Sequence, residues 1–170
     1  DELDLFGLTH VGKVREENQD QFLLATVHPR VVVHGTSLPT EAELPLNGAR
    51  VATLMMVADG VGGGVSGAEA SSLAVRAERA SRAELRTMAT TLTIALAIWP
   101  TAYILQVGDS RCYFYQEGRF RRLTRDQTVA QALLDQGVFT KESAAISPLG
   151  NVLASAIGAD EAFPEVTRVD

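Results

Sequence analysis

The chain has 170 residues, the length of one ordinary domain, and its 46% hydrophobic and 21% charged residues are typical of a globular protein with a packed core. The formal net charge is -6, and Lys and Arg nowhere form a long block, which argues against general affinity for nucleic acid or acidic membranes. Cys112 is the single cysteine, so no intrachain disulfide can form, and no signal-peptide pattern is visible. We therefore expect a cytoplasmic protein with neither nucleic-acid nor membrane partners. We also expect a monomer.

The first half of the chain predicts mainly strands. Apolar runs at residues 5–12 and 21–27 flank a polar loop, and residues 51–59 form a nearly continuous apolar run, the pattern of a strand covered on both faces. Residues 28–50 predict a long connection or an elaborated hairpin, because prolines and glycines surround a short apolar run. The alanine-rich segment from Gly67 to about Glu84 favours a helix.

The second half predicts hairpins followed by a helix. Short turns separate four strand-like runs, which indicates an antiparallel meander over residues 90–99, 102–109, 111–116 and 119–124. Residues 126–137 then predict a helix, which Asp126 or Thr128 can cap and Gly137 can stop. Residues 138–151 predict a small helical or irregular segment. Hairpins mixed with helices indicate an α+β fold with antiparallel sheet.

A glycine-rich stretch directly follows the third predicted strand. Gly62, Gly64 and Gly67 match the G-x-G-x-x-G spacing of dinucleotide-binding loops, so a nucleotide-binding protein is one interpretation. Asp59 would then stand beside the pyrophosphate and repel it. The region around Glu84, where this fold needs a strand that ends in an acidic residue, is also helix-like.

A second interpretation makes Asp59 a ligand for a divalent cation. A carboxylate at a strand end, beside backbone that glycine makes accessible, suits Mg²⁺ or Mn²⁺, and Gly60 can add its carbonyl oxygen. Asp20 precedes a predicted strand and Asp109 ends one, so the three aspartates could converge at one end of a sheet. The three histidines have no zinc-like spacing and no cysteine support, which makes a zinc site improbable.

Five segments resemble, in order, motifs of the metal-dependent Ser/Thr protein phosphatases of type 2C in their bacterial form. The matching segments are "GLTHVGKVREENQD" with its Arg-x-x-Asn-Gln-Asp, "VADGVGG" with Asp-Gly-x-Gly-Gly, "MATTLTIAL" near Gly-Thr-Thr-Leu, "VGDSRCYFYQEGRFRRLTRDQT" with Val-Gly-Asp-Ser-Arg, and "NVLASAIG" as a later strand. The resemblance implies a four-layer α-β-β-α sandwich with two antiparallel sheets.

The resemblance also implies roles for five residues. Asp59 would bridge two Mn²⁺ or Mg²⁺ ions, and the Gly60 carbonyl would bind one of them. Asp20 would contact metal-bound water, and Asp109 would lie near a weaker third metal position. Arg15 would hold the substrate phosphate. The implied reaction is hydrolysis of phosphoserine and phosphothreonine in phosphorylated proteins, the substrates of a Ser/Thr kinase, by attack of a metal-bridging water.

The chain departs from the family pattern at three places. Val61 stands where many eukaryotic members have a histidine, so the leaving group would take its proton from water or another donor. Between Ser71 and Thr90 there is room for little more than one of the two expected helices, and the later Asp-Gly and Asp-Asn motifs are absent. We expect residues 1–170 to form a single type 2C phosphatase-like domain that lacks part of its helical layer and its C-terminal end.

Two further expectations follow from the resemblance. The alternative to an enzyme is a catalytically inactive phosphatase-like domain that serves in binding or regulation. Residues 137–150 are expected to form a mobile flap beside the site, because their composition is loop-like and the resemblance puts a variable segment there.

Overall fold

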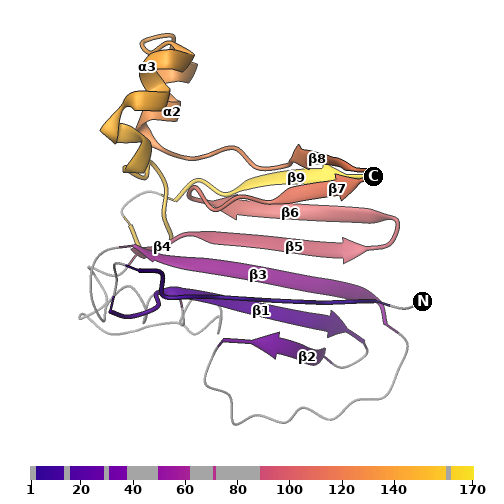
Figure 1. Cartoon of the computed structure of the whole chain (residues 1–170). Helices are drawn as coiled ribbons and strands as arrows, with labels where there is room; N and C mark the ends of the chain where they lie inside the picture. Colours follow the sequence, from indigo (N-terminus) through magenta and orange to yellow (C-terminus); the bar gives the residue numbers. More distant parts are fainter. Residues whose placement is uncertain are drawn as a thin grey trace.

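The computed structural model describes residues 3–13, 16–28, 31–37, 50–61, 71, 89–159 and 162–170. Within these ranges one large antiparallel sheet carries most of the fold, and a two-stranded hairpin forms a second sheet (Figure 1). The strands of the large sheet are, in spatial order, β2 (Val31–Thr36), β1 (Asp20–Val27), β3 (Ala52–Val61), β5 (Leu92–Ile98), β6 (Thr101–Val107) and β9 (Glu165–Val169), and the short β4 (Ala89–Thr90) pairs with the end of β3. The expected α+β class with antiparallel sheets is confirmed, and the four-layer sandwich stays a prediction.

The central strands form where apolar and β-branched residues were expected to make strands. β1 pairs with β3, β3 with β5, and β5 with β6, each in antiparallel register. Small and apolar side chains fill the buried positions along these strands, among them Ala25, Met56, Ala58, Ile104 and Val107. Val57 is exposed, so the prediction that β3 is covered on both faces is wrong at that position.

A hairpin and a helical unit follow β6 in the chain. The hairpin consists of β7 (Tyr113–Gln116) and β8 (Arg119–Arg122), and the helices are α2 (Val129–Asp135), α3 (Lys141–Ile146) and the 3-10 helix η2 (Pro148–Asn151). Thr128 caps α2, since its hydroxyl accepts the Gln131 N–H, and Gly137 follows the helix end with a φ of +73°. Both the cap and the stop were predicted.

The N-terminal segment differs from its prediction. Residues 5–12 were expected to form a strand, but they join no ladder with the described residues. Phe6 and Leu8 remain 82% and 79% exposed, and Gly7 lies against the Phe22 ring of β1. An apolar run becomes a strand only where a partner edge accepts its hydrogen bonds, and no described edge does so here.

The end of the chain also differs from its prediction. The apolar run at residues 152–158, expected as a later strand, makes two isolated bridges with the described part of the chain, from Leu153 to Thr128 and from Ile157 to Thr90, and no ladder there. The last strand is β9, which pairs with β6 and was not predicted, because its mostly exposed position leaves little apolar pattern in the sequence. Of the predicted helix from Gly67 to about Glu84, only Ser71 is described, and it is helical.

Candidate metal centre

Asp20 and Asp59 lie directly opposite each other on neighbouring strands. β1 begins at Asp20, and the antiparallel register pairs this residue with Asp59 near the end of β3. Residues paired in this way point to the same face of the sheet, with Cβ atoms about 4.5–5.5 Å apart. Asn18 sets the start of β1, because its Oδ1 accepts the Asp20 N–H at 3.1 Å while its Nδ2 donates to Thr9 Oγ1 at 2.7 Å.

The main chain of Asp59 is held by two buried threonines. Its carbonyl oxygen accepts the Thr91 N–H at 2.9 Å and the Thr90 hydroxyl at 2.8 Å, and its own N–H donates to Thr91 Oγ1 at 3.2 Å. The next residue, Gly60, donates its N–H to the Gln19 carbonyl at 3.1 Å. Several hydrogen bonds therefore fix the main chain of Asp59, from which its carboxylate extends.

Asp109 lies at the same end of the sheet on the turn after β6. The register of β5 and β6 pairs Leu92 with Val107, which brings this turn beside Thr91. Gly108 permits the turn with a φ of +100°, and its N–H donates to Gln127 Oε1 at 2.8 Å. Because β6 is two strands away from β3, Asp109 stands roughly 10 Å from Asp59 by strand spacing alone. The structure thus places all three predicted aspartates at one sheet end, with Asp20 and Asp59 close and Asp109 more distant.

The oxygen ligands at this sheet end suit a hard divalent cation, although they are few. Two carboxylates directly opposite each other destabilise a strand pair, and a cation bound between them would replace that repulsion with attraction. Carboxylate and carbonyl oxygens are the ligands that Mg²⁺ and Mn²⁺ prefer. Within the described ranges, no three His, Cys, Asp or Glu side chains cluster so that they could hold a metal ion. Asp20, Asp59 and the Gly60 carbonyl therefore fit part of such a site.

Two predicted features lie outside the described residues. These are Arg15, the expected phosphate ligand, and the loop from Gly62 to Gly67, on which the nucleotide-binding interpretation depends. Both stay predictions.

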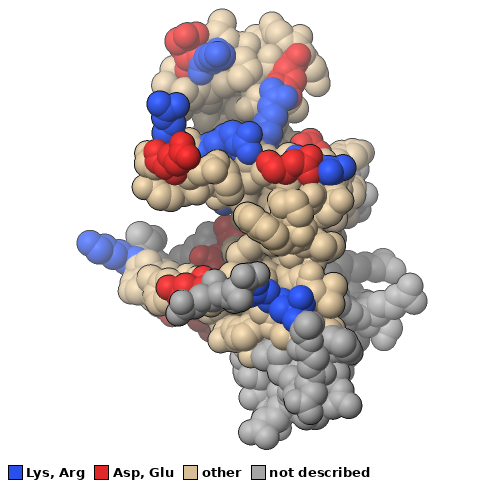
Figure 2. All heavy atoms as spheres, turned by 90° about the vertical axis from the view of Figure 1, so that its right-hand side faces the viewer, with Lys and Arg blue, Asp and Glu red and all other residues tan. Residues whose placement is uncertain are grey.

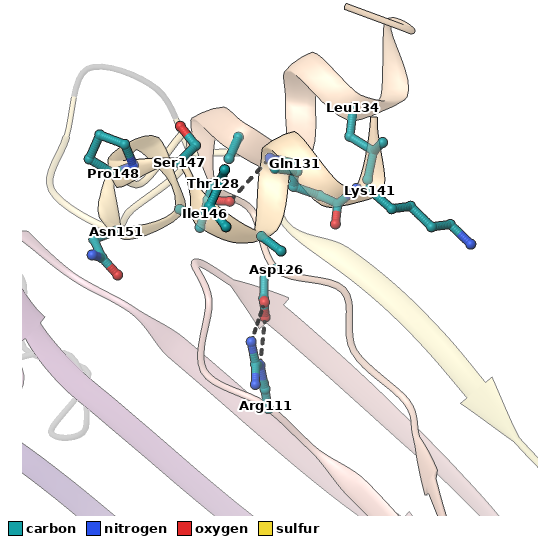
Figure 3. A pocket seen from close by; sticks show the side chains of 14 residues that line it. Arg111, Asp126, Thr128, Gln131, Leu134, Lys141, Ile146, Ser147, Pro148 and Asn151 are labelled. Atoms are coloured by element: carbon teal, nitrogen blue, oxygen red, sulfur yellow. Dashed lines mark hydrogen bonds and ion pairs between the residues drawn. The ribbon is translucent and has the colours of Figure 1, made fainter. Parts of the chain in front are cut away.

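A pocket of about 720 Å³ lies between Arg111 and the helical unit (Figure 3). Its base is the pair formed by Arg111 and Asp126, in which Arg111 Nε and Nη2 donate to the two carboxylate oxygens at 3.1 and 2.7 Å. This paired carboxylate raises the pKa of the Arg111 guanidinium above its ordinary value. Leu134 of α2 and Lys141 of α3 lie on the helical side. Asp126 was predicted only as a possible helix cap, and no sequence pattern indicated its pairing with Arg111.

Basic and acidic side chains alternate over the hairpin and helices (Figure 2). Four arginines cluster in and directly after the hairpin, Arg119, Arg121, Arg122 and Arg125, and two of them form ion pairs: Arg122 contacts Asp126, and Arg125 contacts Asp135. Arg121 instead lies over the Phe114 ring, 5.7 Å from its centroid. The cluster is therefore not a one-signed patch of the kind that binds nucleic acid. No helix among the described residues is long and apolar enough to cross a membrane.

The chain is similar in sequence to known bacterial phosphatases. No protein-family model matches the chain. The Ser/Thr protein phosphatase PstP of Mycobacterium tuberculosis is 30% identical over 146 residues, and the Ser/Thr phosphatase stp of Listeria welshimeri is 38% identical over 80 residues. The chain belongs to the bacterial type 2C phosphatase family. The two alignments cover 68% and 47% of this chain.

The sequence alignments cover a small part of the relatives, whereas the structural match covers nearly all of this chain. The aligned part of the chain spans only 28% of PstP and 32% of stp, so about a third of each curated relative or less is represented. The solved structure of the S. agalactiae Ser/Thr phosphatase matches with a TM-score of 0.70 at 24% identity, over 95% of this chain and 72% of that one. This likeness shows that the chain shares the fold of a type 2C phosphatase.

Proposed function

We propose that this chain is part of a protein phosphatase that hydrolyses phosphoserine and phosphothreonine with the help of two Mn²⁺ or Mg²⁺ ions. The observation that carries the proposal is the register that sets Asp20 opposite Asp59 at the sheet end. The names of two similar proteins also support the proposal, since both are called Ser/Thr phosphatases. The substrates we propose are proteins that a Ser/Thr kinase has phosphorylated. The active form we propose is a monomer.

Each residue of the site would have a separate task. Asp59 and Asp20 would hold the cations, the Gly60 carbonyl would add a ligand, and Asp109 would serve a more distant position. The bound ions would supply charge stabilisation for the phosphoryl group and lower the pKa of water. Arg15 would hold the phosphate through its bidentate guanidinium, which stays charged at all working pH values.

Two structural proposals accompany this function. We propose that residues 1–170 belong to a single type 2C phosphatase-like domain, which the 95% coverage of this chain in the match to the S. agalactiae phosphatase supports. We also propose the four-layer α-β-β-α sandwich as the architecture of this domain. Val61 carries no proton to donate, so the leaving serine or threonine would take its proton from water.

Hydrolysis of a phosphothreonine peptide by the full-length protein tests this function. We expect activity with Mn²⁺, loss of activity on chelation, and a drop of roughly 100-fold or more in Asp59→Asn, because the ion would lose a charged ligand. Glu165→Gln is the matched control, since it removes an exposed carboxylate on the edge strand β9 and should leave activity unchanged.

Two outcomes would contradict the proposed hydrolysis. Activity that persists both after chelation and in Asp59→Asn would rule out the metal-dependent mechanism. Mn²⁺ binding without any hydrolysis would instead favour the inactive binding or regulatory domain.

A further inference from the structure

Thr91 connects the two strand ends that carry Asp59 and Asp109. It directly precedes β5, whose neighbours in the sheet are β3 and β6, and only 1% of its surface is exposed. Its hydroxyl oxygen accepts the Asp59 N–H at 3.2 Å and lies 2.7 Å from Ser110 Oγ. Its own N–H donates to the Asp59 carbonyl at 2.9 Å. One side chain thus contacts the backbone of one aspartate and the immediate neighbour of the other.

The turn that carries Asp109 is held against Thr91 by other neutral side chains. The Ser110 carbonyl accepts hydrogen bonds from Thr93 Oγ1 at 3.2 Å and from Gln106 Nε2 at 3.3 Å. Gln106 also donates to the Gly108 carbonyl at 2.9 Å. The turn therefore has its position defined by β5 and β6 before any cation binds.

The methyl group of Thr91 sets the packing of the same turn. A Cβ at Gly108 would lie 2.7 Å from Thr91 Cγ2 and 2.8 Å from Thr91 Cβ, so the turn passes as close to the threonine as a glycine allows. The hydroxyl and the methyl therefore have different tasks. The hydroxyl links Asp59 to Ser110, and the methyl fills the space beneath the turn.

A hydroxyl suits this link because it can accept and donate at once. Thr91 Oγ1 has one proton and two lone pairs, so it can accept the Asp59 N–H and still form a hydrogen bond with Ser110 in either direction. Valine has the same shape without either capacity, whereas serine keeps the hydroxyl and loses the methyl. These two replacements separate the link from the packing.

We propose that Thr91 is a positioning residue, which sets the affinity for divalent cations by holding Asp59 in register with the Asp109 turn through Ser110. This inference rests on the proposed metal site. Thr91 would touch neither cation nor substrate. It would act as residues behind metal ligands do in general, by fixing where the ligands stand.

Amide NMR spectra of the full-length protein without metal test the link itself. Thr91→Val should shift the amide signals of Asp59 and Ser110 together, and Ser110→Ala should shift that of Asp59, while Thr91→Ser should leave both near their original positions. Thr101→Val is the matched control, because it removes a hydroxyl that bonds to Asp170 at the opposite end of the sheet. If Thr91→Val moves the Ser110 signal no more than Thr101→Val does, the link is wrong.

Calorimetric titration with MnCl₂ tests the consequence for binding. Thr91→Val should weaken Mn²⁺ binding roughly 10- to 100-fold, and Thr91→Ser should restore it to nearly the original affinity. If the unaltered protein binds Mn²⁺ and Thr91→Val binds it equally well, the positioning role is wrong and the proposed function stands. If the unaltered protein binds no Mn²⁺, the metal site is wrong and the positioning role falls with it. Should Thr91→Val fail to fold, Ser110→Ala gives the same test through the other half of the link, with weaker binding expected and unchanged binding contradicting it.

Discussion

Replacement of Gly108 by alanine measures how closely the Asp109 turn packs against β5. Gly108 has a φ of +100°, and an added Cβ would lie 2.7 Å from Thr91 Cγ2, 2.8 Å from Cβ and 3.3 Å from Cα. A left-handed backbone costs an L-residue roughly 1–2 kcal/mol, and overpacking a filled site typically costs about 1–3 kcal/mol more. We therefore expect Gly108→Ala to lower the free energy of unfolding by about 2–5 kcal/mol, a large part of the ~5–15 kcal/mol typical of a domain.

Urea denaturation followed by circular dichroism measures this loss against two matched controls. Gly118 and Gly137 also have positive φ values, of +77° and +73°, but an added Cβ at either position meets nothing within 4 Å. Their alanine variants should lose only the backbone part, about 1–2 kcal/mol. The difference from Gly108→Ala is then the steric part. If Gly108→Ala is no more destabilising than the two controls, the close approach of the turn to Thr91 is refuted.

Three further predictions concern residues around the candidate site. Burial raises the pKa of the Cys112 thiol, so iodoacetamide should alkylate it more slowly at neutral pH than a cysteine in a short peptide, and a peptide-like rate would contradict its burial. Arg111→Ala should lower the free energy of unfolding by only about 0.2–1 kcal/mol, and by less in high salt, because its ion pair with Asp126 is partly solvated. Urea denaturation at two salt concentrations measures this loss. A loss above ~2 kcal/mol in high salt would argue against a solvent-screened pair. Thr140→Ala should destabilise α3 by about 0.5–2 kcal/mol, since its hydroxyl accepts the Ser143 N–H; hydrogen exchange across α3 should rise, and unchanged exchange would exclude the cap.

The sequence predicted those strands that have a clear run of apolar and β-branched residues. β1, β3, β5 and β6 have apolar and β-branched runs, and the turns between them contain glycine, proline or aspartate, so both strands and connections could be located. The N-terminal segment and β9 could not be predicted correctly, because a strand at an edge is decided by its partner. Phe6 and Leu8 look like strand residues without joining one, whereas β9 joins one with hardly any apolar pattern.

The candidate site was predicted in its residues but not in its geometry. Asp20 and Asp59 were identified from their positions at strand ends, yet only the strand register shows that they face each other. The contacts of Thr91 with Asp59 and Ser110 could not be read from the sequence, since a neutral hydroxyl gives no periodic signal and these partners lie 32 and 19 positions away in the chain.

Anomalous scattering at the manganese edge, from crystals of the full-length protein grown with Mn²⁺, tests the central claim most directly. The proposed site predicts at least one strong anomalous peak within ligand distance of both the Asp20 and Asp59 side-chain regions at the sheet end, and the loss of that peak in Asp59→Asn. Manganese peaks found only elsewhere on the protein, with these two aspartates facing each other in the absence of any ion, would contradict it.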